Sequence, residues 1–318
     1  MSIGARPSVA RRTVAGSRRE FSEISFSLDP PASAPPSLDS RSVALLHRAR
    51  EHGVTTFDVS GARFPERAER LLARAFPTSD PSVCAIVSRS VRSLARERSN
   101  VAGSSMPDLN TALRDSLEGS RRRLAPVPIG VIEWLAGDET ATAGPSESSL
   151  TYDLGKEAAP AIWATELPRA GNLSTDAAGG SPGLVTGALS LLETELIPAF
   201  ESAGAGRRSG LIAYDPFAGG RLDGSRFAEQ SLLPGPATGP VDVRRLHEEF
   251  DPVLRLGFLT EGRRRTLGQA ALQFVLAWSW VVTTVVPLPS PERFDELLDY
   301  TTRPPLTGEE LERIGLVK

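Results

Sequence analysis

Helical stretches alternate with short apolar runs along most of the chain. Ile24–Leu28 alternates apolar and small polar residues and predicts a first strand. Ser40–His52 then carries apolar residues near helical spacing, Gly53 ends this helix, and Val54–Asp58 predicts a second strand. The same order repeats toward the C-terminus. The other predicted strands are Val83–Val87, Ile129–Leu135, Ala161–Thr165, Leu184–Leu189, Leu211–Tyr214 and Thr283–Val286, and the other predicted helices are Glu66–Phe76, Leu109–Leu124, Glu193–Ala203, Thr266–Trp278 and Pro291–Tyr300, the last begun by a cap at Ser290-Pro291.

Eight strand and helix units predict one closed (β/α)8 barrel over residues 1–318. Continuous apolar runs such as Val83–Val87 are typical of parallel strands covered on both faces. The chain of 318 residues is somewhat longer than the roughly 250 residues typical of such barrels. A doubly wound open sheet is the competing fold, but no G-x-G-x-x-G sequence opens any helix. Segments rich in Gly, Ser and Pro at Ala141–Ser149, Ala170–Gly183 and Leu232–Gly239 are expected to be loops at the end of the barrel where sites lie.

Composition narrows the choice of partners and compartment. Lys plus Arg number 36 against 39 Asp plus Glu, so the net charge of −3 gives no general attraction to nucleic acid. A single cysteine, Cys84, excludes an intramolecular disulfide framework and any multi-cysteine metal site, which favours a reducing cytoplasm. No apolar run reaches the roughly 20 residues of a membrane span. We therefore expect a cytoplasmic protein with no metal, whose partner is a small molecule or another protein.

Six segments carry a resemblance to a known family. They are Arg11-Arg12-Thr13 through Glu23-Ile24-Ser25-Phe26; Gly53-Val-Thr-Thr-Phe-Asp58 with Glu66…Glu69-Arg70-Leu71-Leu72; Ser116-Leu117-Glu118…Arg122-Arg123-Leu124; Leu211-Ile-Ala-Tyr214-Asp-Pro216-Phe-Ala-Gly-Gly220-Arg-Leu222; Gln269-Ala270-Ala271-Leu272…Leu276-Ala277-Trp278; and Val286-Pro287…Ser290-Pro291-Glu292. In this order they resemble the aldo-keto reductases. The resemblance implies the barrel independently, and it implies that residues 1–23 contain an N-terminal hairpin that plugs the barrel bottom rather than a transit peptide.

The family reduces carbonyl compounds with a hydride from NADPH, and the resemblance places its catalytic groups on this chain. A Tyr serves as general acid, a Lys and an Asp tune it, and a His orients the substrate. Asp58 is retained, but Arg63 stands at the Tyr position and Arg89 at the Lys position. Arg89 holds its proton at neutral pH, and we expect it to pair with Asp58. The His position falls on Leu135 by gapless counting, or on Glu133 after a shift of two residues.

The positions that hold the cofactor in the family are also altered. Its Ser-Asn pair corresponds to Thr165-Glu166 and its Gln to Thr186, which removes or weakens the clamp on the nicotinamide. Tyr214 aligns with the aromatic residue that stacks on the nicotinamide ring, and Asp215 follows it. In the loop expected to bind the 2′-phosphate, three prolines leave Ser290, Glu292 and Arg293 as the polar groups. We therefore expect weak NADPH binding or none.

Three functions remain open at this point. A ligand-binding, scaffold or regulatory protein that has lost redox chemistry ranks first, and an active NAD(P)H-dependent reductase with atypical catalytic residues ranks second. A lyase or isomerase that uses Asp58, Glu133 and Glu166 ranks third. Either Tyr152 or Tyr214 is a candidate replacement acid, whereas the three histidines, His47, His52 and His247, are expected to lie away from the site.

Overall fold

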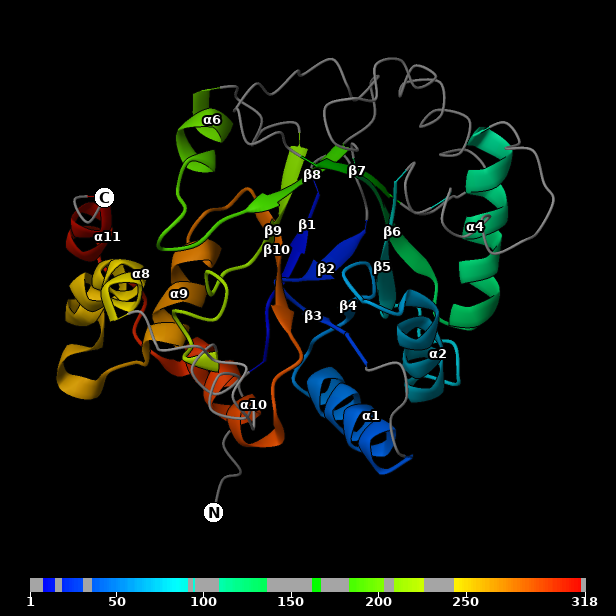
Figure 1. The fold of residues 1–318 in the computed structure, drawn as a ribbon. Coiled ribbons are helices and arrows are strands. Elements are labelled where there is room, and N and C mark those ends of the chain that lie inside the picture. The colour runs from blue at the N-terminus through cyan, green and yellow to red at the C-terminus, as the bar shows by residue number, and fades with distance from the viewer. Residues whose placement is uncertain are drawn as a thin grey trace.

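Eight parallel strands close into a barrel, and a two-stranded hairpin lies beside it (Figure 1). The computed structural model describes residues 8–14, 19–30, 36–90, 94, 109–135, 162–166, 183–202, 209–225 and 243–315. The hairpin strands are β1 (Arg11–Thr13) and β2 (Glu20–Ser22). The barrel strands are β3 (Ile24–Ser27), β4 (Thr56–Asp58), β5 (Cys84–Arg89), β6 (Ile129–Trp134), β7 (Ile162–Glu166), β8 (Gly183–Ala188), β9 (Ser209–Tyr214) and β10 (Val281–Pro287). Each barrel strand pairs with the next, and β10 closes the ring against β3.

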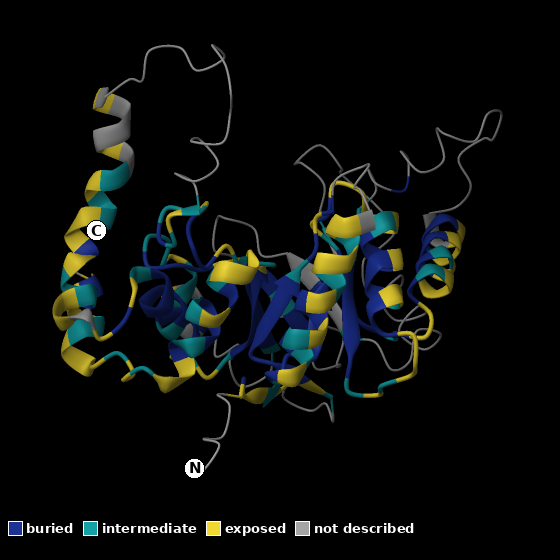
Figure 2. Cartoon of the chain, turned by 90° about the horizontal axis from the view of Figure 1, so that it is seen from below, coloured by how far each residue is buried: buried dark blue, intermediate teal, exposed yellow. Residues whose placement is uncertain are grey.

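Helices surround the barrel and bury one face against it (Figure 2). The described α-helices are α1 (Pro36–Glu51), α2 (Pro65–Ala75), α4 (Leu109–Leu124), α6 (Leu196–Ser202), α8 (Val243–Arg255), α9 (Leu267–Leu276), α10 (Pro291–Leu298) and α11 (Gly308–Gly315), with 3-10 helices η2 (Leu256–Arg263) and η3 (Asp299–Thr302). Among these described helices, none is long and apolar enough to cross a membrane.

Strand alternation separates two apolar layers. On β5, Cys84 and Ile86 join the cluster that fills the barrel interior, whereas Ala85 and Val87 join the larger cluster between strands and helices. This is the period of two expected for a strand, and it continues to the strand end. The next two residues, Ser88 and Arg89, therefore face inward and outward respectively.

The hairpin covers the N-terminal ends of the barrel strands. Phe21 lies in the interior cluster, and the Ser22 hydroxyl accepts hydrogen bonds from the amides of Thr55 and Thr56 as β4 begins. Arg12 donates from the hairpin to three backbone carbonyls at the end of α9 and the start of β10, those of Leu276, Trp278 and Val281. The predicted hairpin plug is thus confirmed, and it is fixed to the last barrel strand.

All eight predicted barrel strands and the predicted (β/α)8 fold are confirmed, with strand ends that differ by at most two residues. The capping mechanism expected for α10 is wrong. Ser290 stands at the N-cap with extended backbone and Pro291 follows, but the Ser290 side chain makes no capping hydrogen bond. It contacts the Glu292 carboxylate instead, and this contact helps to lower the pKa of that exposed group, after the larger effect of the Glu292 amide.

Candidate functional site

Five polar side chains gather where the barrel strands end. Asp58 is the last residue of β4, Ser60 follows two residues later, Ser88 and Glu133 lie near the ends of β5 and β6, and Tyr214 ends β9. We call these five residues the mouth cluster. Strand register places Ser88 opposite Glu133, and hydrogen bonds join Ser60 to Ser88 and to Tyr214. The carboxyl ends of barrel strands are where (β/α)8 proteins keep their sites, so this cluster is the candidate site.

Asp58 is a carboxyl group almost completely removed from water. Its side chain is 1% exposed, and its Oδ1 accepts the Ser60 amide at 2.8 Å. Burial raises its pKa from 3.8 to about 6, and hydrogen bonds from Ser60 and Gly61 act in the opposite direction. Among the described residues, no Arg or His forms an ion pair with Asp58. The group therefore titrates near neutral pH.

Tyr214 lies between the Asp58 turn and Glu133. Its hydroxyl is 3.3 Å from the Ser60 Oγ and donates to the Glu133 Oε2 at 3.3 Å. Burial, followed by the charges of Asp58 and Glu133, raises the pKa of Tyr214 well above its ordinary value. The hydroxyl therefore remains protonated, and its two contacts are longer than the 2.7–2.8 Å typical of such hydrogen bonds.

The expected ion pair between Asp58 and Arg89 is wrong. Arg89 faces outward from β5, where its Nε donates to the Ser116 Oγ at 2.7 Å and its Nη2 contacts Ser120. The Glu69 carboxylate lies 3.9 Å from the Arg89 Nη2. Counting by resemblance placed Arg89 at the mouth, but strand alternation gives that direction to Ser88.

Two more of the predicted catalytic residues, Arg63 and Leu135, form no described contact with the mouth cluster. Arg63 is exposed, and its backbone amide donates to the Asp29 carboxylate at 2.8 Å. Leu135 lies one residue past β6, partly exposed, and its amide donates to the Arg89 carbonyl. Glu133 is 3% exposed and contacts Tyr214, so of the two alternatives it is the residue that lies in the mouth cluster.

The loop after β9 has an unusual backbone with an acidic residue at its start. Asp215 and Ala218 have positive φ values of 52°, and Gly219 and Gly220 follow at 66° and 79°. Both Asp215 carboxylate oxygens accept the Gly219 amide, at 2.7 and 2.9 Å. A carboxylate of the protein itself thus occupies this backbone amide.

Arg293 is also engaged by this loop. Its Nη1 lies 3.3 Å from the Asp223 carboxylate, and its Nη2 donates to the Asp223 carbonyl. Asp223 therefore neutralises the one basic side chain of the predicted 2′-phosphate loop. Together with Asp215, it gives this region an arrangement that does not fit the phosphates of NADPH.

Of three further residues predicted to bind the cofactor, the structure describes the side chain of only one. Thr186 is buried on β8 and follows Leu184 of the interior cluster by two residues, so it faces inward. Thr165 and Glu166 belong to β7, but their side chains lie outside the described part of the structure, as does Tyr152. Among the described residues, there is no group of three or more His, Cys, Asp or Glu side chains that could hold a metal ion.

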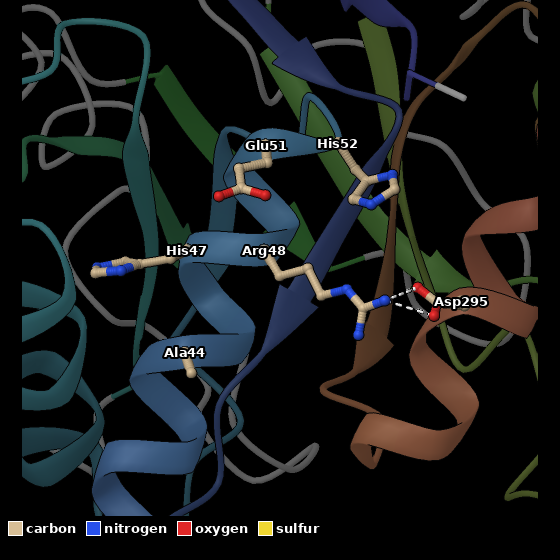
Figure 3. Close-up of a pocket in the computed structure, with 6 residues that line it drawn as sticks. All are labelled: Ala44, His47, Arg48, Glu51, His52 and Asp295. Carbon is tan, nitrogen blue, oxygen red and sulfur yellow. Dashed lines mark hydrogen bonds and ion pairs between the residues drawn. The ribbon is translucent and has the colours of Figure 1, made fainter. Parts of the chain in front are cut away.

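A separate groove of about 480 Å³ lies on the flank of the barrel, between α1 and α10. It is lined by Ala44, His47, Arg48, Glu51, His52 and Asp295 (Figure 3). His47 points away from His52, and its Nε2 bonds to the Ala75 carbonyl, whereas Arg48 pairs with Asp295. These two histidines lie away from the mouth cluster, as expected; the side chain of His247 is not described.

Ser60 and Ser88 were missed by sequence reasoning. Small hydroxyl residues carry no motif of their own. Their positions could have indicated them, because each lies two residues after a side chain that faces the barrel interior, Asp58 or Ile86.

A closed parallel barrel with a hairpin under it and polar groups at the strand ends defines a (β/α)8 protein. Comparison with solved structures shows which (β/α)8 proteins this chain resembles in fold. Aldo-keto reductase AKR11C1 from Bacillus halodurans is similar in its apo and holo forms, with TM-scores of 0.66 and 0.67 and 17% and 16% identity, over 97% of this chain and 96% of that protein. The glycerol dehydrogenase AKR11B4 from Gluconobacter oxydans gives a TM-score of 0.71 at 16% identity, over 96% of this chain and 94% of its own. The chain therefore has the aldo-keto reductase fold. No family profile and no curated protein matches its sequence.

Proposed function

We propose that this chain binds a small polar molecule at the mouth cluster and does not perform NADPH-dependent carbonyl reduction. The aldo-keto reductase fold supports a small-molecule site at this end of the barrel. The chemistry of the described residues favours a use of that site other than hydride transfer.

The observation that carries the proposal is the surroundings of Tyr214. A tyrosine that protonates a carbonyl needs a pKa lowered toward the working pH, and a nearby cation provides this. Here burial, followed by the charges of two carboxyl groups, raises the pKa of Tyr214, and Arg89 points out of the barrel toward Glu69. The described part of the chain contains no lysine. Tyr214 is therefore a weak acid but an effective hydrogen-bond donor.

The region that would receive NADPH supports the same proposal. Asp215 fills the Gly219 amide, and Asp223 pairs with Arg293. An incoming phosphate would meet two carboxylates, while Arg293 is already paired with Asp223 and the Arg221 charge acts on Asp215. Such like-charge contacts cost binding free energy rather than supply it.

An active reductase is the second candidate. It is favoured by the presence of both Asp58 and Tyr214 in the mouth cluster, inside a fold shared with a reductase. In this alternative Tyr214 would have to act as the acid without a cation beside it.

NADPH titration of the purified protein separates the two functions. We expect no saturable change in nicotinamide fluorescence below about 1 mM, which corresponds to a binding free energy weaker than about −4 kcal/mol. A matched Arg293→Ala variant should behave like wild type, because Asp223 already occupies that side chain. Low-micromolar binding by wild type, lost in Arg293→Ala, would overturn the proposal and support the reductase.

A further inference from the structure

The Tyr214 hydroxyl is a donor with only weak partners. Its distances to the Ser60 Oγ and the Glu133 Oε2 are both 3.3 Å. An acceptor that approached to the usual 2.7–2.8 Å would replace the contact with Glu133 at a net gain. Hydrogen bonds used in catalysis are often long without substrate and shorten when it binds. This hydroxyl is therefore suited to hold a carbonyl oxygen.

A carboxyl group able to accept a proton belongs to the same cluster and is linked to this hydroxyl through Ser60. Asp58 is held by the Ser60 amide, and Ser60 in turn contacts Tyr214. A carboxyl that titrates near neutral pH is suited to general base catalysis, and burial brings the Asp58 pKa into this range. Among the described residues, Tyr214 stays protonated and interacts electrostatically with both Asp58 and Glu133.

The remaining groups at the strand ends are hydroxyls. Ser60 and Ser88 are half-buried, and Thr186 faces inward from β8. Hydroxyl groups donate to and accept from a hydroxylated substrate without requiring it to be charged. With the nearby carboxyl groups, they favour a neutral substrate over an anionic one.

We propose that the mouth cluster catalyses proton transfer, without a cofactor, at the carbon next to the carbonyl of a short α-hydroxy carbonyl compound, with Asp58 as base and Tyr214 as donor to the carbonyl oxygen. This activity rests on the ligand site proposed above and adds a reaction to it.

The step conserves atoms and electrons within the substrate and Asp58. The C–H bond next to the carbonyl breaks, and its proton forms an O–H bond with the Asp58 carboxylate. The electron pair of that bond becomes a carbon–carbon double bond, and the carbonyl oxygen gains negative charge under the Tyr214 hydroxyl. Return of the proton to the same carbon regenerates the substrate, and return to the neighbouring carbon, with the hydroxyl proton shifting to the former carbonyl oxygen, isomerises it. No oxidant or reductant is needed.

Hydrogen exchange into deuterated water tests this activity directly. Hydroxyacetone and dihydroxyacetone are incubated with the protein in D2O without nucleotide, and loss of their C–H proton signals is followed by NMR. We expect exchange at least tenfold faster than in buffer alone. The rate should rise with pH through about 6, since only ionised Asp58 accepts the proton, and then level off.

Substitutions test the proposed roles of Asp58 as the base and of Tyr214 as the hydrogen-bond donor. Asp58→Asn keeps an acceptor for the Ser60 amide but removes the base, so exchange should fall at least a hundredfold. Tyr214→Phe removes the donor and should slow exchange by a similar factor while the pH midpoint stays near that of wild type. Asp295→Asn, which alters an exposed carboxylate paired with Arg48, should exchange at the wild-type rate. Circular dichroism confirms that each variant is folded.

Two results overturn the inference. One is exchange of both ketones at the buffer rate, and the other is a folded Asp58→Asn variant as fast as wild type. Either result leaves the proposed function standing if NADPH still fails to bind. Tight NADPH binding with rapid exchange would instead remove the proposed function and retain this activity.

Discussion

At the scale of single residues, ionised Asp58 lowers the stability of the fold at neutral pH because its carboxyl group is buried. A carboxyl whose pKa is raised in the folded state stabilises the fold only while protonated, so this stabilisation is lost as the pH rises from about 4 to about 6. The difference amounts to about 3 kcal/mol, at 1.4 kcal/mol for each pKa unit. Proteins tolerate such a group mainly where it has a function.

Asp58→Asn should therefore be more stable than wild type at neutral pH. Urea unfolding at pH 7.5 should show a gain of about 2 to 3 kcal/mol, which disappears at pH 4 where wild-type Asp58 is protonated. Asp80→Asn is the opposite control, because hydrogen bonds from Ser82 and the Arg50 charge lower the Asp80 pKa, so its loss should destabilise above pH 4. Equal stability of Asp58→Asn and wild type at pH 7.5 would argue that Asp58 is solvated.

Behind the barrel wall, Glu69 is the centre of a buried charge network. It accepts the Ser120 hydroxyl and the Arg123 Nε, both at 2.5 Å, and lies 3.9 Å from Arg89. Glu69→Gln leaves the buried Arg89 without its anion, so we expect a loss of about 3 kcal/mol in urea unfolding. The control Glu118→Gln breaks an exposed pair on α4 and should cost less than about 0.5 kcal/mol. A smaller loss for Glu69→Gln than for this control would show that water screens the network.

The sequence indicated some of these residues and not others, for physical reasons. Asp58 and Glu133 were identified because the resemblance to the aldo-keto reductases places catalytic positions at the ends of their strands. The direction of Arg89 was predicted wrongly, because a motif position does not determine which face of a strand a side chain occupies. The contacts of Glu69 depend on how two helices pack against β5, and no pattern within either helix encodes that.

At the scale of elements, one side chain links the hairpin to the end of α9 and the start of β10. Arg12 donates to the carbonyls of Leu276, Trp278 and Val281 and pairs with Glu23, which also accepts the Tyr300 hydroxyl. These carbonyls include the end of α9, where a cation is favourable. The element therefore depends on a residue that the sequence shows only as one of many arginines.

Arg12→Ala should loosen this attachment. Three lost hydrogen bonds at about 1 kcal/mol each predict a destabilisation of about 3 kcal/mol, measured by urea unfolding. Arg11→Ala, next along the same strand, removes an exposed pair with Glu20 and should cost less than about 1 kcal/mol. Similar losses for both variants would mean that the apolar contacts of Phe21 hold the hairpin instead.

Elements were predicted well because periodicity is a local property. Buried strands gave continuous apolar runs, and α9 begins with a capping box between Thr266 and Gln269, within the predicted start of that helix. The short helix α11 and the 3-10 helix η2 were not predicted. Both are short, and η2 is interrupted at Gly262, so neither repeats an apolar pattern often enough to be recognised.

At the scale of the whole molecule, we expect Asp215 and Asp223 of the loop after β9 to disfavour anionic ligands on the β9 and β10 side of the barrel. Asp215→Asn/Asp223→Asn should free the Gly219 amide and Arg293, while asparagine still tolerates the positive φ at position 215. We expect NADPH affinity to rise at least tenfold, measured by fluorescence titration. Asp251→Asn/Asp295→Asn, which removes two exposed carboxylates paired with Arg255 and Arg48, controls for the same change in net charge. An equal gain in that control would assign the effect to overall charge rather than to this loop.

Closure of the barrel by β10 against β3 also sets the order of events during synthesis. Thr284 pairs with Ile24, so the first barrel strand gains its second neighbour only after β10 has left the ribosome. Until then β3 and β9 each present an open edge, the kind of surface that pairs with other chains and aggregates. Contacts so distant in sequence also make folding slow. Nascent chains that end before Val281 should therefore accumulate as chaperone-bound or insoluble material, which fractionation of truncated products would reveal.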